Sequence, residues 1–262
     1  MNNSLQAVSG GQGRDVILLH GLFGRGSNLR GIARALEPYF RVHCLDLPDH
    51  GRSQWLGAAS LDAYAEEVSV WMTSNRIDEG DVIGHSLGGK VAMQLALNHA
   101  AQVRRLVVAD IAPVQYPVQH AEILTVMARV QAAQCQTRAA AEAVLAEVIA
   151  EPEVRAYLLM SLTSGSTGYQ WCFNLAGLTA GYPQLRAPPS GQQQCQAPTL
   201  FLRGGESGYI MSDHLPEISR RFPHCRVQTV PHAGHWLHVD QPGLVHDAIE
   251  RHLLEDIAPV CN

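Results

Sequence analysis

The sequence predicts an α/β protein in which a mostly parallel sheet carries helices on both faces and is interrupted once by a helical cap. Short apolar runs alternate with longer amphipathic stretches, a pattern typical of a parallel sheet covered by helices. The alternation stops after Asp110 and resumes near Thr199. The 262 residues are 46% hydrophobic and 16% charged, enough for one large domain with a sizeable core. We therefore expect a core domain of residues 1–112 and 198–262, with residues 113–197 inserted as the cap.

The elements of the core follow from the lengths of the apolar runs. Before the insertion, strands are expected at residues 16–19, 41–45, 82–83 and 105–110, and helices at residues 29–36, 60–74 and 87–98. Ser60 can begin the second of these helices because its hydroxyl can accept a hydrogen bond from a free backbone N–H. After the insertion, strands are expected at residues 199–203 and 226–230, and helices at residues 213–221 and 242–255.

The insertion contains no clear strand and reads as helical. Residues 121–134 and 138–150 are alanine-rich and amphipathic, and residues 169–178 are compatible with a further helix. Pro152 suits the first turn of another helix, because a proline lacks only an N–H that is unpaired at that position.

Composition excludes several classes of function. The net charge is −5 with a pI near 6.2 and no basic stripe, which argues against nucleic acid as a partner. No apolar run is long enough to span a membrane, and no basic start precedes an apolar run, so a cytoplasmic protein is expected. The six cysteines are scattered without a C-x-x-C pair, which predicts reduced thiols and no zinc site.

The stretch Asp81-Val-Ile-Gly-His-Ser-Leu-Gly-Gly-Lys-Val-Ala92 fits two motifs with different chemistry. Read from Gly84 to Lys90, it is nearly a phosphate-binding loop. That loop needs Ser or Thr directly after its lysine to bind Mg²⁺, and this position is Val91. The sequence therefore rejects the phosphate loop.

Read as Gly84-His-Ser-Leu-Gly88, the same stretch is a nucleophile elbow. Ser86 would sit on a sharp turn between a strand and a helix, and glycines on either side allow the crowding because they have no Cβ. A bare serine is a poor nucleophile, so a base, an acid and an oxyanion hole must accompany it.

The sequence offers candidates for the base and the oxyanion hole. His235 follows the last strand, where the chain order serine, acid, histidine places the base, and His232 and His238 are its neighbours. The glycine-rich turn after the first strand would supply a backbone N–H from Leu22 or Phe23, alongside the N–H of Leu87.

Chain order alone does not identify the acid of the triad. The loop after residues 199–203 often carries it, but the expected position is Ser207. Asp110, at the end of an apolar strand, and Glu206 are the substitutes. A buried carboxylate at Asp110 would need a partner to offset its desolvation, which favours Asp110.

These residues resemble the α/β-hydrolase fold and, within it, the small bacterial YbfF-type esterases. The resemblance covers the chain from Val16 onward and lies in the segments His20-Gly-Leu-Phe-Gly24, Asp46-Leu-Pro-Asp-His-Gly-Arg-Ser53, Gly84-His-Ser-Leu-Gly-Gly-Lys90, Asp110-Ile-Ala-Pro113, Trp171-Cys-Phe-Asn-Leu175, Ser207-Gly-Tyr-Ile210 and Ala233-Gly-His-Trp236. It implies a sheet of eight strands or slightly fewer, with the cap after the sixth strand. It also implies cleavage of esters or acyl-CoA thioesters, and an acid taken from the strand after the elbow, which supports Asp110.

The resemblance also assigns supporting roles. Lys90 would be a helix-surface charge, and Asp46 and Arg52 would brace a loop. At Cys172 an arginine is more usual, so the preference for the acyl group or headgroup can differ here.

The resulting hypothesis is ester hydrolysis through an acyl-enzyme on Ser86, without a metal or organic cofactor. The partner would be a small-molecule ester or thioester, and the protein a monomer or homodimer. An apolar substrate pocket is expected around aromatic residues, Tyr116, Trp171, Phe173, Tyr209 and Trp236. Carbon–carbon bond hydrolases and cofactor-free perhydrolases use the same triad, and a non-catalytic receptor on this fold is the alternative of a different class.

Overall fold

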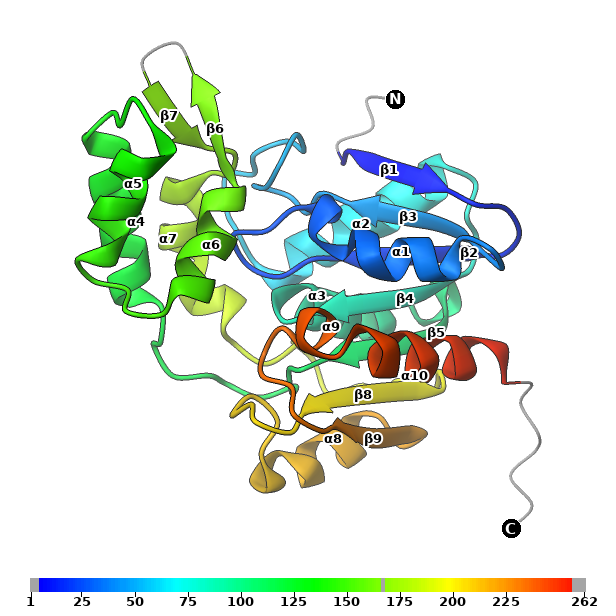
Figure 1. Cartoon of the computed structure of the whole chain (residues 1–262). Coiled ribbons are helices and arrows are strands. Elements are labelled where there is room, and N and C mark those ends of the chain that lie inside the picture. The colour runs from blue at the N-terminus through cyan, green and yellow to red at the C-terminus, as the bar shows by residue number, and fades with distance from the viewer. Residues whose placement is uncertain (1–4, 166–167, 256–262) are drawn as a thin grey trace.

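The computed structural model describes residues 5–165 and 168–255, and a seven-stranded sheet forms its centre (Figure 1). The strand order is β1-β3-β2-β4-β5-β8-β9, and all neighbours are parallel except β1 and β3. The strands are β1 (Ala7–Gly10), β2 (Asp15–Leu19), β3 (Arg41–Leu45), β4 (Gly80–His85), β5 (Val103–Ala109), β8 (Thr199–Gly204) and β9 (Cys225–Val230).

Helices cover both faces of this sheet, as the sequence predicts. One face carries α1 (Arg30–Leu36) and α10 (Pro242–Leu254), and the other carries α2 (Leu61–Ser74), α3 (Leu87–Asn98) and α8 (Leu215–Arg221). The short helix α9 (Leu237–Asp240) and the 3₁₀ turns η1 (Gly26–Leu29), η2 (Ala100–Gln102) and η3 (Ser212–His214) complete the core.

The continuous apolar character of the strands follows from this two-sided cover. Val16 and Leu18 of β2 pack with α1 and α10, whereas Ile17 and Leu19 pack with α2 and α3. All four side chains are fully buried. A strand that is buried on both faces loses the apolar–polar alternation of a half-exposed strand, which is why short apolar runs located these strands in the sequence.

Most expected core elements are confirmed, and Ser60 caps α2 by accepting a hydrogen bond from the Ala63 N–H at 3.1 Å. Among the strands and α-helices of the core, β1 and α9 were not predicted. The residues of β1 are at most half-buried, so they form no apolar run.

The cap follows the fifth strand in chain order, and not the sixth, because only five strands of the described chain precede it.

The segment of residues 113–197, which we call the cap segment, is helical but also contains a β-hairpin. Its helices are α4 (Ala121–Ala132), α5 (Arg138–Ala146), α6 (Pro152–Met160) and α7 (Leu175–Leu185), and its hairpin is β6 (Leu162–Gly165) with β7 (Gly168–Trp171). The prediction that this segment contains no strand is therefore wrong. The helix predicted over residues 169–178 is also wrong in its extent. The helix begins only at Leu175, because the Asn174 side chain accepts a hydrogen bond from the Gly177 N–H and caps it.

Two expected supporting roles have different outcomes. The Asp46 carboxylate accepts hydrogen bonds from the backbone N–H groups of Gly26 and Arg52, at 2.8 and 3.0 Å, and so braces two loops as expected. Lys90 is not a surface charge: only 2% of it is exposed.

The five cysteines in the described residues are free thiols, and Cys261 lies outside them.

Lys90 joins the core to both ends of the cap segment. Its ammonium group donates to the carbonyls of Val114, where the chain leaves the core, and of Arg186 and Ala187, where it returns, at 2.5–2.9 Å. Burial, with the Arg186 charge nearby, lowers the pKa of Lys90 to about 7, whereas the three carbonyl dipoles stabilise its charged form. The only lysine of the chain is thus a buried connection between two parts of the fold.

Replacing this lysine should destabilise the fold. In Lys90→Met the carbonyls of Val114 and Ala187 lose their donor, whereas the Arg186 carbonyl still accepts from the Tyr116 N–H. Each buried unpaired polar group costs about 1–3 kcal/mol. We expect the free energy of unfolding, measured by urea denaturation, to fall by about 3 kcal/mol or more. The matched control is Arg226→Met, which removes an exposed ion pair with Glu255 and should cost less than about 1 kcal/mol. Equal stability of the two variants would contradict this role of Lys90.

Candidate active site

The carboxyl ends of the parallel strands lie at the edge of the sheet that faces the cap segment (Figure 1), and the predicted functional residues follow these strands in the sequence. Leu22 follows β2, Ser86 follows β4, Asp110 follows β5 and His235 follows β9. Because parallel strands all end at the same edge of a sheet, loops that are distant in sequence meet there. The strand order places β2, β4, β5, β8 and β9 side by side, and the loops that follow them converge at this edge.

Ser86 occupies a strained turn between β4 and α3. Its backbone has φ 53° and ψ −118°, a conformation that costs free energy for a residue with a side chain. The turn is possible because the residues two positions before and two positions after Ser86 are glycines. A Cβ on Gly84 would lie 2.2 Å from the carbonyl oxygen of Gly88, and one on Gly88 would lie 2.1 Å from that of Leu19. The Ser86 N–H donates to the carbonyl of Ala109 at 3.0 Å, which ties the turn to the end of β5.

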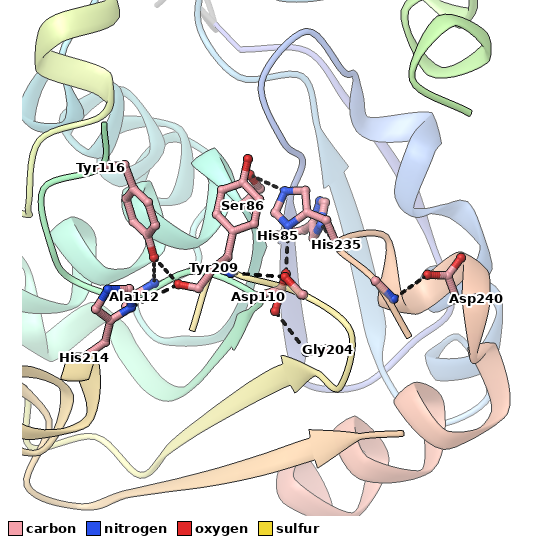
Figure 2. Close-up of polar contacts among 12 residues, drawn as sticks. His85, Ser86, Asp110, Ala112, Tyr116, Gly204, Tyr209, His214, His235 and Asp240 are labelled. Carbon is pink, nitrogen blue, oxygen red and sulfur yellow. Dashed lines mark hydrogen bonds and ion pairs between the residues drawn. The ribbon is translucent and has the colours of Figure 1, made fainter. Parts of the chain in front are cut away.

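Ser86, His235 and Asp110 form a continuous chain of hydrogen bonds (Figure 2). His235 Nε2 lies 3.0 Å from Ser86 Oγ, and His235 Nδ1 lies 2.8 Å from Asp110 Oδ2. A carboxylate at Nδ1 favours the tautomer in which Nδ1 carries the proton and Nε2 can accept one. The arrangement can therefore withdraw the proton of the serine hydroxyl.

The Asp110 carboxylate is fully buried and receives two further hydrogen bonds. The Gly204 N–H donates to Oδ1 at 2.9 Å, and the Ser207 hydroxyl donates to Oδ2. Like Ser86, Asp110 has a positive φ, 51°. The position where the chain order suggested an acid is thus occupied by a serine that binds the carboxylate from the neighbouring strand.

The alternative acid and base candidates lie away from this chain. The Glu206 side chain is 67% exposed, and its ion-pair partner is His232, which is also exposed. His238 is half-buried, and its ring packs against His85 at a centroid distance of 4.8 Å. The structure brings together Asp110 and His235, and not these neighbours, at Ser86.

The loop after β2 distinguishes between the two proposed oxyanion donors. The Phe23 N–H already donates to His50 Nε2 at 3.2 Å, so it does not serve as a free donor. No partner for the Leu22 N–H occurs among the described residues. Among the two candidates, Leu22 is therefore the one whose backbone N–H is not engaged by another described residue.

Side chains of the cap segment hold this loop from the other side. The Tyr157 hydroxyl donates to the Leu22 carbonyl at 3.0 Å, and the Ser161 hydroxyl donates to the Phe23 carbonyl at 2.7 Å. Both residues belong to the α6 region. Sequence reasoning missed both residues, because they are separated from this loop by 135 and 138 positions and only the fold brings them to it.

Buried neutral histidines surround the site. Burial lowers the pKa of His50 to about 4, and its Nδ1 lies 2.8 Å from the Pro48 carbonyl, which it reaches as a donor. Burial also lowers the pKa values of His20 and His85 well below the usual range. His85 Nε2 contacts the carbonyl of His235 at 2.9 Å and so fixes the backbone of the candidate base.

The expected substrate-pocket residues divide into two groups. Tyr209 stacks on the His235 ring at a centroid distance of 3.9 Å, and Tyr209, Trp236 and Tyr116 line cavities at Ser86. Trp171 and Phe173 do not line these cavities. They stack on each other at a centroid distance of 5.4 Å, the Trp171 indole N–H donates to the Met127 carbonyl, and Phe173 packs against Phe23 and His50 of the core. Their assignment to the pocket is therefore wrong. Cys172 lines a separate cavity, with Arg25 and Arg52, that does not include Ser86.

Two further findings concern the described part of the chain as a whole. None of the helices within residues 5–165 and 168–255 has the length and apolar character that a membrane crossing requires. The same residues contain no cluster of three or more side chains suited to hold a metal ion.

Comparison with known proteins gives consistent similarities. The chain matches the alpha/beta hydrolase family over residues 16–248. It is 35% identical over 242 residues to the sn-1-specific diacylglycerol lipase ABHD11 of Mus musculus, covering 89% of this chain and 79% of that protein. It is 34% identical to the esterase YbfF of Escherichia coli K12, covering 91% and 92%. A solved structure described as a marine microorganism esterase has a TM-score of 0.92 at 32% identity and covers 95% of this chain and 99% of that one.

The buried histidines should make stability depend on pH. Because His50 and His238 have a folded pKa of about 4, the unfolded chain binds more protons than the folded chain between about pH 6.5 and pH 4. Stability is then fully present above about pH 6.5 and decreases as the pH falls, by about 1.4 kcal/mol per pH unit for each such histidine. Urea unfolding at pH 7.5, 6 and 5 measures this slope. We expect His50→Gln to reduce the slope and His232→Gln, at an exposed position, to leave it unchanged; a flat wild-type profile would refute the argument.

Proposed function

The chain belongs to the alpha/beta hydrolase family, and from this premise we propose that it is a serine hydrolase that cleaves carboxylic esters through an acyl-enzyme on Ser86. The observation that carries the proposal is the hydrogen-bonded chain from Ser86 through His235 to the buried Asp110, located at a strand–turn–helix elbow. The similarity to proteins described as esterases and a lipase supports ester cleavage.

Acylation begins when Ser86 Oγ attacks the ester carbonyl carbon. The hydroxyl proton passes to His235 Nε2, and the carbonyl π electrons move onto the carbonyl oxygen. We assign the N–H groups of Leu22 and Leu87 to bind this oxyanion, since the Phe23 N–H is engaged with His50. The Asp110 carboxylate accepts the Nδ1 hydrogen bond and stabilises the imidazolium that forms.

The intermediate then collapses and the acyl-enzyme is hydrolysed. The carbon–oxygen bond to the leaving alcohol breaks, and the imidazolium gives its proton to that oxygen. Water next attacks the acyl carbon, with His235 accepting its proton and returning it to Ser86 Oγ as the acid departs. The residues named supply every proton transfer in the cycle, so no step calls on a metal or organic cofactor.

Other reactions with the same triad have less support. Carbon–carbon bond hydrolysis and cofactor-free perhydrolysis would use the same three residues, but no contact of the described residues favours either. A receptor would not require the strained turn at Ser86 or the buried, fully hydrogen-bonded Asp110. Thioester cleavage, a cytoplasmic location and a monomeric or homodimeric state stay predictions.

The serine is the first element to test. Wild type should hydrolyse p-nitrophenyl acetate and butyrate, whereas Ser86→Ala should lose about four or more orders of magnitude in kcat, because removal of the nucleophile leaves only the oxyanion hole and binding. Release of p-nitrophenol, followed by absorbance with thermal melting as a folding control, measures this. If well-folded wild type hydrolyses neither p-nitrophenyl ester, the proposal is refuted.

The acid assignment has a matched pair of variants. Asp110→Asn should lower kcat by about four orders of magnitude, since an amide at this position no longer holds the required tautomer of His235. Glu206→Gln changes the same functional group at an exposed position and should leave kcat within about twofold. Steady-state kinetics on p-nitrophenyl butyrate decides between them, and comparable loss in both variants, or full activity in Asp110→Asn, would contradict the assignment.

A further inference from the structure

Two cavities of unequal size meet at Ser86. Both are lined by Ser86, Leu22, His120 and Tyr209. We call them the small cavity, of about 50 Å³, and the large cleft, of about 270 Å³. A further hollow of about 510 Å³ adjoins the large cleft and shares Tyr157 and Trp236 with it. The two sides of the serine therefore accept groups of different size.

His235 lines only the large cleft, and this fixes which part of an ester each cavity takes. Figure 2 shows Tyr116, which lines the small cavity, and His235 on opposite sides of Ser86. In the tetrahedral intermediate the former carbonyl oxygen binds the oxyanion donors, and the leaving oxygen must reach His235 Nε2 to receive its proton. The alcohol portion is thus directed into the large cleft. The remaining substituent, the acyl chain, points away from His235 into the small cavity.

The small cavity cannot expand easily, because its walls are hydrogen-bonded to one another. The Tyr116 hydroxyl donates to the Tyr209 carbonyl at 2.5 Å and accepts from the Ala112 N–H at 2.9 Å. The Arg186 guanidinium donates to the Tyr116 carbonyl at 2.6 Å, and the Lys90 ammonium lies over the Tyr116 ring. Forcing extra methylene groups into such a packed site costs about 1–3 kcal/mol. A cavity of this volume holds roughly three or four water-sized atoms.

The large cleft is wider than the small cavity, and its walls are apolar. Tyr157, Leu158 and Trp236 give it apolar walls, and the adjoining hollow adds Met160. The charged residues that line the adjoining hollow are Glu153 and Asp240, both acidic, and neither a lysine nor an arginine lines it. Carboxylates at this rim would repel a leaving group that bears phosphates.

From these two cavities we propose that the protein selects esters that join a short acyl group, of about two to four carbons, to a bulky, uncharged and apolar alcohol. The inference rests on the proposed function and adds the orientation of the substrate. It assigns Leu185 and Tyr116 to the acyl side and Leu158 and Trp236 to the alcohol side.

A pair of isomeric esters tests the orientation directly. Hexyl acetate and ethyl hexanoate contain the same atoms and differ only in which side of the ester is large. We expect kcat/KM for hexyl acetate to exceed that for ethyl hexanoate by about tenfold or more, since a single misplaced methylene already costs about 10-fold or more in a tight pocket. Acid release by the wild type, corrected for Ser86→Ala, gives both rates. An equal or reversed preference would overturn the proposal while leaving ester hydrolysis intact.

Two matched variants locate the selectivity. Leu185→Ala and Leu158→Ala delete the same atoms from buried side chains, one in each cavity. Leu185→Ala should raise the relative rate on ethyl hexanoate about tenfold, whereas Leu158→Ala should not. Leu185→Val, a smaller deletion, should give an intermediate change if the alanine variant folds poorly. A larger shift in Leu158→Ala than in the Leu185 variants would reverse the assignment of the cavities.

The remaining outcomes separate this inference from the function on which it rests. Turnover of p-nitrophenyl acetate without turnover of either isomer would overturn the bulky apolar alcohol and keep the esterase. No Ser86-dependent turnover of any of these esters would remove both. Hydrolysis of acetyl-CoA as efficient as that of hexyl acetate would contradict the uncharged leaving group.

Discussion

The buried carboxylate of Asp110 is the constraint on which the rest of the site depends. A charged group without solvent contact is stable only when its oxygens are hydrogen-bonded, and here three donors are supplied by Gly204, Ser207 and His235. The parallel pairing of β5 with β8 brings the ends of both strands together and so places two of these donors. The third donor is the base itself. Folding of the sheet edge and orientation of His235 are therefore the same event.

Much of this arrangement could be predicted from the sequence, for reasons that are local. The glycines around Ser86 are required by the close approach of neighbouring backbone, so they mark the elbow without any knowledge of the fold. The strands that are buried on both faces appear as apolar runs. Asp110 was identifiable because a carboxylate at the end of such a run requires a partner. Each of these signals is contained in a few consecutive residues.

The features that the sequence did not predict depend on contacts between distant segments. Nothing near Lys90 indicates that three carbonyls from the two ends of the cap segment surround its ammonium group. The competition for the Phe23 N–H is visible only when His50, 27 residues away, is in place. Trp171 and Phe173 are of residue types that suit a substrate pocket, but in the fold they pack against each other, and Phe173 also packs against Phe23 and His50. Aromatic residues serve packing and binding equally well, so their type alone does not decide the role.

In the proposed mechanism the cap segment holds the loop that carries the oxyanion donor, in addition to lining the cleft at Ser86. Tyr157 and Ser161 donate to the carbonyls of Leu22 and Phe23, and His50 accepts the Phe23 N–H from the other side. The peptide group that joins Leu22 to Phe23 is thus held at both its oxygen and its nitrogen, while Phe23 retains a positive φ of 63°. An oxyanion donor is effective only when its direction is set before the reaction. Two of these contacts come from α6 and its end, so displacement of this helix would release the loop. The proposed mechanism therefore couples enclosure of the substrate to stabilisation of the oxyanion through the same residues.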